Sequence, residues 1–142
     1  MVADWDMEAA EKGGYEHFML KEINEQPNAI KQTISPRIKD GMPDLEECGL
    51  TAEKLASYSS IFVVACGTAM HAGLVGKYVI EKLARVPVTV DVASEFRYRD
   101  PIIGKGDLVI VVSQSGETAD TLEALKLSKR LGAQTLAIVN VV

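Results

Sequence analysis

Hydroxyl side chains gather in one short segment of the chain, whose sequence is SQSGET. Its three hydroxyl donors are Ser113, Ser115 and Thr118. Gln114 adds a side-chain amide, and Gly116 allows a ligand to approach the backbone closely. Hydroxyl and backbone N–H donors suit a phosphate dianion without the lysine of an ATP-type site. The segment therefore predicts a phosphate-binding loop, and the alternative is a polar turn whose Ser and Thr residues only cap a helix.

A second polar segment that carries a glycine, CGTAMH, covers residues 66–71. We expect Gly67 and Thr68 of this segment to border the same ligand. His71 either faces a bound sugar or simply occupies the first turn of a helix. Glu117 is expected to organise its own loop or the start of a helix rather than to transfer protons.

The elements that would position these segments follow from hydrophobic periodicity. Apolar runs rich in β-branched residues predict four strands, at residues 61–66, 88–93, 108–112 and 135–139. Helical periodicity predicts two helices, at residues 72–85 and 119–131, the first with Leu74, Val75, Tyr78, Val79 and Leu83 on one apolar stripe. This alternation predicts an α/β fold, a three-layer α/β/α sandwich with a parallel sheet in the flavodoxin-like order 2-1-3-4-5. In that order the two polar segments follow neighbouring strands and meet at the carboxyl edge of the sheet.

The first 58 residues have a different pattern. They predict helices at residues 15–25, from Pro27 to Pro36 and near residues 51–58, with no strand within residues 15–39. We therefore divide the chain into a helical lead-in, residues 1–58, and an α/β domain, residues 59–142. Because the chain stops directly after a predicted strand, we expect this domain to be truncated at its C-terminus.

Composition and charge exclude several classes of function. The chain is 47% apolar and 25% charged, as in ordinary globular domains, and its apolar runs are far shorter than the roughly 20 residues that span a bilayer. The first 60 residues carry six Lys/Arg against twelve Asp/Glu, which disfavours nucleic-acid binding. The Cys and His residues lack metal-ligand spacing, and neither a Walker A nor a G-x-G-x-x-G pattern is present. We expect a cytoplasmic protein with no metal, no cofactor and a buried, reduced thiol at Cys66.

Three motifs in this order, ACGTAMHAGLVGKY, VASEFRYRD and SQSGETADTL, resemble the sugar isomerase (SIS) domain family. Together with the lead-in EKGGYEHFMLKEINEQPNAIKQTI, they resemble more narrowly the first SIS subdomain of the glutamine:fructose-6-phosphate aminotransferases, or glucosamine-6-phosphate synthases. The resemblance implies binding of fructose 6-phosphate or glucosamine 6-phosphate in amino-sugar biosynthesis. It also implies two partner domains in the parent enzyme, an N-terminal glutaminase and a second SIS subdomain. The implied ligand residues are Thr68, Ser113, Gln114, Ser115 and Thr118.

The chain departs from the family pattern at one position of the site. Many members have serine where this chain has Ala69, so one hydroxyl contact is missing and only the backbone of Ala69 can help. No catalytic residue is assigned, because the glutaminase cysteine and the base, ring-opening histidine and Schiff-base lysine of the isomerase have no matching positions here. The resemblance therefore implies that residues 1–142 by themselves bind the sugar phosphate without converting it.

Two other interpretations remain open. The chain could be an SIS domain of a stand-alone phosphosugar isomerase or of a transcription regulator that senses sugar phosphates. We also expect a dimer or a higher oligomer, with residues 135–142 or the segment 94–100 in the contact. A solvated loop is the alternative for the segment 94–100.

Overall fold

The computed structural model describes residues 12–140, which divide into two compact units, one ending at Gly49 and the other beginning at Leu50. The first unit contains α2 (Phe18–Ile34), the 3-10 turn η1 (Ser35–Arg37), β1 (Ile38–Lys39), β2 (Met42–Pro43) and the 3-10 turn η2 (Glu46–Cys48). None of the described helices is long and apolar enough to cross a membrane.

The helix α2 corrects the prediction of two helices divided at Pro27. The structure has one helix that contains Pro27 in its interior. A proline there removes one hydrogen bond, the one that would reach back to the carbonyl of Ile23, and costs about 3 kcal/mol in a helix interior. Ile23 is exposed, so water can reach this part of the helix. A solvent-facing helix therefore tolerates the proline that the sequence pattern marks as a boundary.

A short hairpin corrects the prediction that residues 15–39 contain no strand. Strands β1 and β2 pair antiparallel, with Ile38 opposite Pro43. The two linking residues, Asp40 and Gly41, have positive φ values of 52° and 78°. Two-residue turns between antiparallel strands favour this conformation, and Asp-Gly is one of its strongest sequence signals. The lead-in is therefore not entirely helical.

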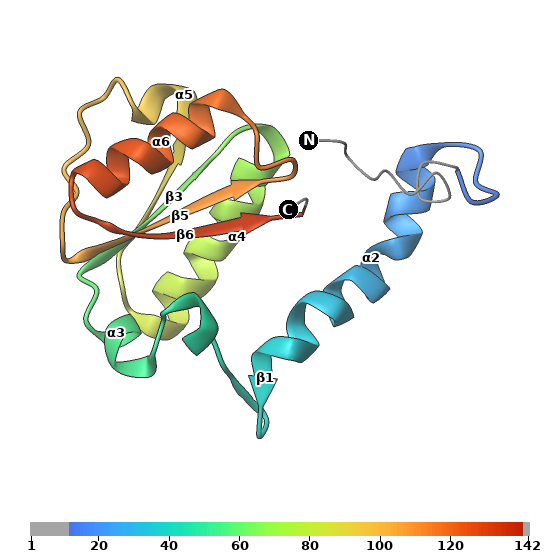
Figure 1. The fold of residues 1–142 in the computed structure, drawn as a ribbon, viewed down its shortest axis with the longest axis horizontal. Helices are drawn as coiled ribbons and strands as arrows, with labels where there is room; N and C mark the ends of the chain where they lie inside the picture. Colours follow the sequence, from blue (N-terminus) through green and yellow to red (C-terminus); the bar gives the residue numbers. More distant parts are fainter. Residues whose placement is uncertain (1–11, 141–142) are drawn as a thin grey trace. The chain divides into compact units, whose positions relative to one another are not determined.

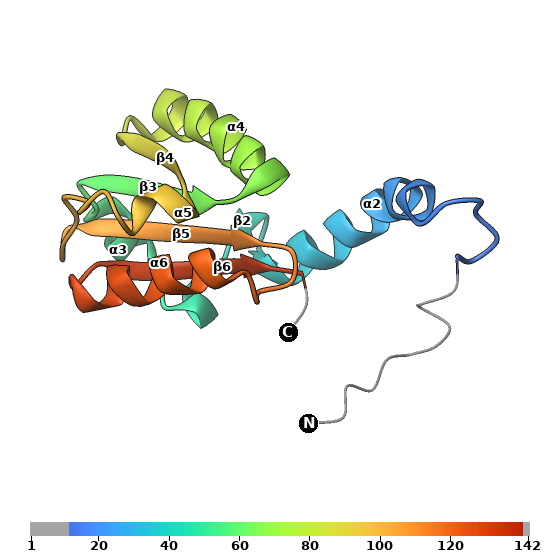
Figure 2. The ribbon, with the colours of Figure 1, turned by 90° about the horizontal axis from the view of Figure 1, so that it is seen from above.

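The second unit has the α/β architecture that the sequence predicts. Its elements are α3 (Ala52–Ala56), β3 (Ser60–Ala65), α4 (Gly67–Ala84), β4 (Val88–Val92), α5 (Ala93–Phe96), β5 (Asp107–Ser113), α6 (Ala119–Arg130) and β6 (Gln134–Val139). The four strands are parallel and lie in the order β4-β3-β5-β6, side by side in Figure 2. This order confirms the predicted 2-1-3-4 arrangement for the described strands.

Two neighbouring residues of β3 show that the sheet is covered on both faces. Val63 lies directly under Gly73 of α4, whereas Val64 belongs to a core cluster with Phe96 of α5 and Ala124 of α6. Because successive side chains of a strand point to opposite faces, α4 covers one face, and α5 and α6 cover the other (Figure 1). The domain is therefore the predicted three-layer sandwich.

The helix α4 presents to the sheet a face that periodicity did not predict. The apolar stripe predicted for residues 72–85 lies away from the sheet, with Tyr78 70% exposed and Leu83 76% exposed. The one buried residue of α4 is Gly73. A Cβ atom at this glycine would lie 2.8 Å from Cγ1 of Val63 and 3.3 Å from Cγ1 of Val90. The absence of a side chain at Gly73 thus lets α4 approach the sheet closely.

Two glycines of α4 make a matched pair for testing this close approach. We expect Gly73→Ala to lower the free energy of unfolding by about 1–3 kcal/mol, because the added methyl group overpacks the contact with Val63. Gly76→Ala is expected to raise it by up to about 1 kcal/mol through helix propensity, since nothing lies within 4 Å of the added atom. Urea unfolding of both variants measures the difference, and equal effects would contradict the packing described here.

Candidate functional site

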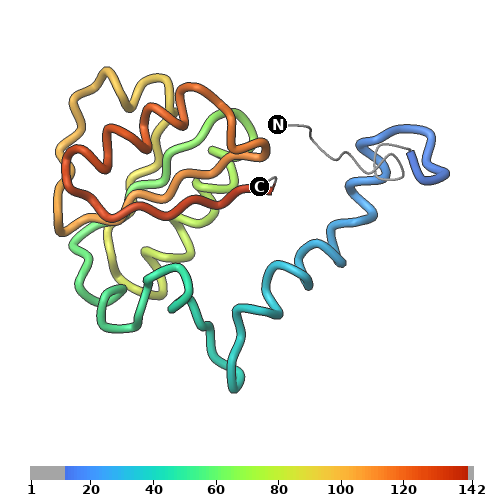
Figure 3. The backbone as a smooth tube through the Cα atoms, in the orientation of Figure 1, coloured from blue at the N-terminus to red at the C-terminus, as the bar shows by residue number. Residues whose placement is uncertain are grey.

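A cavity of about 210 Å³ opens where strands β3 and β5 end. From the β3 side it is lined by Cys66, Thr68 and Ala69. From the β5 side it is lined by Val112, Ser113, Gln114, Ser115, Thr118 and Thr121. Figure 3 follows the backbone through both segments at the same end of the sheet. The cavity thus contains six of the seven predicted site residues and brings the two polar segments together.

The remaining predicted residue, Gly67, begins α4 and does not line the cavity. Its φ of +56° turns the chain from β3 directly into the helix. The predicted loop of residues 66–71 is therefore mostly helical, and Thr68 and Ala69 lie in the first turn of α4. His71 is an exposed residue of the same helix and does not line the cavity, which matches the simpler of the two interpretations.

The serine hydroxyls of the β5 loop are held by the loop's own backbone. The N–H of Gly116 donates to Oγ of Ser113 at 3.1 Å, and the N–H of Glu117 donates to Oγ of Ser115 at 3.2 Å. Each hydroxyl oxygen accepts one of these bonds, so the hydroxyl hydrogen of Ser115 stays available for an anion in the cavity, and that of Ser113 is available when Ser113 does not donate to Oγ1 of Thr118. The backbone N–H of Glu117 thus takes part in the loop, and the role expected for Glu117 itself stays a prediction. These bonds orient both hydroxyls before a ligand arrives.

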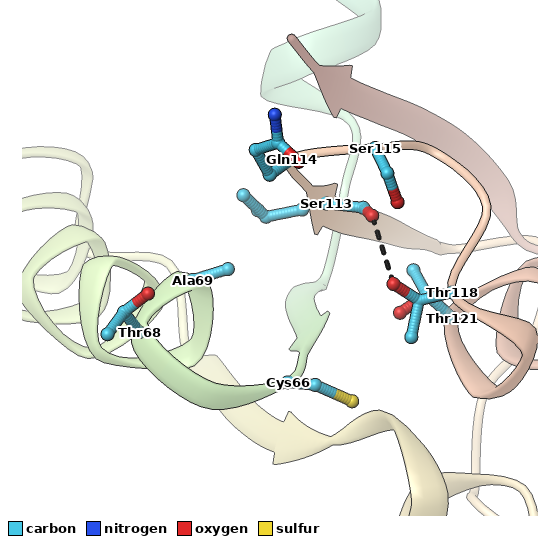
Figure 4. A pocket seen from close by; sticks show the side chains of 9 residues that line it. Cys66, Thr68, Ala69, Ser113, Gln114, Ser115, Thr118 and Thr121 are labelled. Atoms are coloured by element: carbon cyan, nitrogen blue, oxygen red, sulfur yellow. Dashed lines mark hydrogen bonds between the residues drawn. The ribbon is translucent and has the colours of Figure 1, made fainter. Parts of the chain in front are cut away.

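Thr118 stands at the N-cap of α6, but within the described residues its side chain makes no capping hydrogen bond. Its Oγ1 lies instead 3.4 Å from Oγ of Ser113, across the mouth of the loop (Figure 4). The first hydrogen bond inside α6 comes from the N–H of Leu122, so the preceding N–H groups point out of the helix end. The alternative interpretation, in which Thr118 only caps the helix, is therefore not supported by its geometry.

Cys66 is a further residue of the cavity, and it was expected to be buried. The structure leaves it half-buried, and its side chain lines the cavity between the two segments (Figure 4). Both Cys66 and the exposed Cys48 are free thiols. Among residues 12–140, no group of three or more His, Cys, Asp or Glu side chains could hold a metal ion.

The electrostatics of the cavity depend on backbone and hydroxyl dipoles, because all nine lining residues are uncharged. The nearest carboxylate along α6 is Asp120, in the first turn of the helix. Its Oδ1 pairs with an Nη atom of Arg97 at 3.4 Å. This pair partly neutralises a charge that would otherwise repel an anion at the start of α6.

The segment 94–100 divides between core and surface. Phe96 is 1% exposed and packs into the core beside Phe62, whereas Tyr98 is 74% exposed. The guanidinium of Arg97 lies 4.5 Å from the centroid of the Tyr98 ring. The segment is therefore not a solvated loop throughout, and a role of its exposed part in association stays a prediction.

A family model of the SIS domain matches residues 54–142. The chain belongs to the SIS domain family. This assignment confirms the resemblance seen in the three motifs. The cavity lies at the carboxyl edge of the sheet, where neighbouring loops lead to helices on opposite faces. This is the usual place for ligands in open parallel sheets.

The relatives narrow this assignment. The chain is 63% identical over 140 residues to a glutamine–fructose-6-phosphate aminotransferase [isomerizing] of Clostridium acetobutylicum, covering 98% of this chain and 23% of that protein. It is also 63% identical to that of Caldanaerobacter subterraneus subsp. tengcongensis, covering 97% of this chain and 23% of the relative. The chain is thus homologous to part of these aminotransferases and spans about a quarter of their length.

A solved structure agrees with this homology. The C-terminal domain of the glucosamine-fructose-6-phosphate aminotransferase from Francisella tularensis superimposes with a TM-score of 0.82 at 47% identity, covering 93% of this chain and 37% of that chain. Tagatose-6-phosphate ketose/aldose isomerase from Escherichia coli has a TM-score of 0.68 at 15% identity, covering 87% of this chain and 34% of that chain. The second likeness shows a shared fold alone.

Proposed function

We propose that the chain binds the phosphate group of fructose 6-phosphate or glucosamine 6-phosphate as the first SIS subdomain of a glutamine–fructose-6-phosphate aminotransferase. The observation that carries this proposal is the convergence of Ser113, Ser115 and Thr118 on one cavity. Homology to enzymes that are named for fructose 6-phosphate supports the choice of ligand. The proposed ligand residues are Gly67, Thr68, Ala69, Ser113, Gln114, Ser115 and Thr118.

In this proposal each side of the cavity has a distinct role. The hydroxyls of Ser113, Ser115 and Thr118 donate to the phosphate oxygens, together with the unpaired N–H groups at the start of α6. From the other side, Thr68 contributes a hydroxyl, and Gly67 and Ala69 contribute backbone groups in the first turn of α4. The sugar then extends from the phosphate toward the open side of the cavity.

The proposal extends to the parent enzyme. A glutaminase domain would supply ammonia, and a second SIS subdomain would supply the groups that isomerise the sugar. We propose that the described domain binds its ligand without turning it over, that it works in the cytoplasm, and that it associates as a homodimer or a higher oligomer. The parent enzyme would thereby make glucosamine 6-phosphate for amino-sugar biosynthesis.

Isothermal titration calorimetry with matched sugars tests the proposed ligand. We expect glucosamine 6-phosphate and fructose 6-phosphate to give saturable binding, whereas glucosamine and fructose give none, because the proposed contacts are to the phosphate group. Raising the pH from about 5 to 7.5 should strengthen binding, since the second phosphate pKa is about 6 and the dianion accepts stronger hydrogen bonds. Equal affinity for the sugars with and without phosphate would contradict the proposal.

A further inference from the structure

One hydroxyl of the cavity lies outside the SQSGET segment. Thr121 is in the first turn of α6, three residues after Thr118, and its side chain lines the same cavity. Figure 4 shows the two threonine side chains next to each other on the α6 side of the cavity. Residues three apart in a helix share one face, so the helix itself places the Thr121 hydroxyl beside the proposed phosphate ligands.

Thr121 is a buried residue whose hydroxyl has no partner in the described chain. The residue is only 5% exposed, yet its hydroxyl makes no hydrogen bond to any residue in the described part of the chain. Buried hydroxyls normally have a protein partner, as Ser128 on the same helix does through the carbonyl of Ala124 at 2.7 Å. A hydroxyl that belongs to a buried residue, lacks a partner in the described chain and faces a cavity is available for a ligand.

The position of Thr121 also fits the chemistry of a phosphate. The N–H groups of the first turn of α6 leave the helix end on the same side, so an anion there meets backbone donors and the hydroxyl together. All nine lining residues are uncharged, which means that hydroxyl and amide donors must provide the recognition. We propose that Thr121 is an additional phosphate ligand, which donates its hydroxyl hydrogen to a phosphate oxygen of the bound sugar phosphate.

This inference rests on the proposed function and is tested with a pair of variants. Thr121→Val keeps the shape of the side chain and removes the hydroxyl, whereas Thr121→Ser keeps the hydroxyl. Calorimetry with glucosamine 6-phosphate and with inorganic phosphate should show that Thr121→Val binds both about tenfold more weakly or worse, as for a lost hydrogen bond to a charged group. Thr121→Ser should retain most of the affinity.

Thermal stability separates a ligand contact from a structural role. Without ligand, the melting temperature of Thr121→Val should equal or exceed that of the unchanged protein, because the hydroxyl supports no bond within the described chain. The inference is wrong if Thr121→Val binds both ligands normally while Ser113→Ala binds them weakly. It is also wrong if Thr121→Val loses affinity for the sugar phosphate but binds inorganic phosphate normally. A failure of the unchanged protein to bind either ligand would instead overturn the proposed function, and this inference with it.

Discussion

Exchanging Ser113 for alanine and Thr118 for valine in one variant is expected to weaken binding of glucosamine 6-phosphate by at least about 100-fold. Each substitution removes a hydrogen bond to a charged group, worth about 1.5–3 kcal/mol, and tenfold in affinity corresponds to about 1.4 kcal/mol. The two hydroxyls lie 3.4 Å apart and can act on one phosphate group. Calorimetric titration of the double variant measures the loss.

Ser128→Ala serves as the matched control for this double variant. Ser128 is a fully buried serine on α6, but its hydroxyl bonds the Ala124 carbonyl inside the helix and does not line the cavity. The control should therefore change stability and leave ligand affinity within about twofold. If the double variant binds normally, or if the control loses as much affinity, the phosphate does not occupy the proposed position.

The second large effect concerns the core beneath the site. Phe96→Ala should lower the free energy of unfolding by about 3–5 kcal/mol, because truncating a buried aromatic side chain leaves a cavity. Phe96 is 1% exposed, and its ring meets the Phe62 ring edge to face with centroids 6.4 Å apart. For a domain of this size we expect the melting temperature to fall by at least about 10 °C, as measured by calorimetry or circular dichroism.

Ile102→Ala provides the comparison for the Phe96 variant. Ile102 follows α5 in the chain but is 97% exposed, so its truncation should change the free energy of unfolding by no more than about 0.5 kcal/mol. A Phe96 variant as stable as the Ile102 variant would show that α5 does not anchor the core. The short α5 would then be a surface segment, contrary to the packing described here.

The sheet could be predicted from sequence because its strands are short apolar runs, whose length and β-branched composition distinguish them from helices. The face of α4 could not, because its apolar stripe is the exposed one and the close contact is made by Gly73. Helical periodicity places large apolar side chains on the buried face of a helix. It therefore does not detect a helix that contacts the sheet through a glycine. The interior position of Pro27 in α2 was also not predicted. Whether the lost hydrogen bond is costly depends on how exposed the helix is, and the sequence pattern does not show that exposure.

Most of the cavity could be predicted because parallel topology places the segments after β3 and β5 together. Three lining residues were missed, Cys66, Val112 and Thr121, and two of them had a usable signal. Cys66 is the first residue after β3, at the carboxyl edge where ligands bind. Thr121 lies at helical spacing from Thr118, which puts it on the same face of α6. Gly67 was predicted to border the cavity but does not line it, and it is the first residue of α4.

The location of the phosphate can be tested directly by an NMR titration of the backbone amides with glucosamine 6-phosphate. We expect saturable shifts concentrated at residues 67–69 and 113–121, where the cavity donors lie, and little change in α2. Titration with glucosamine, which lacks the phosphate, should leave the chemical shifts of the same amides unchanged. Largest shifts elsewhere, such as along the exposed side of α4 at Val75 and Tyr78, or no shifts at saturating ligand, would contradict a phosphate site between β3 and β5.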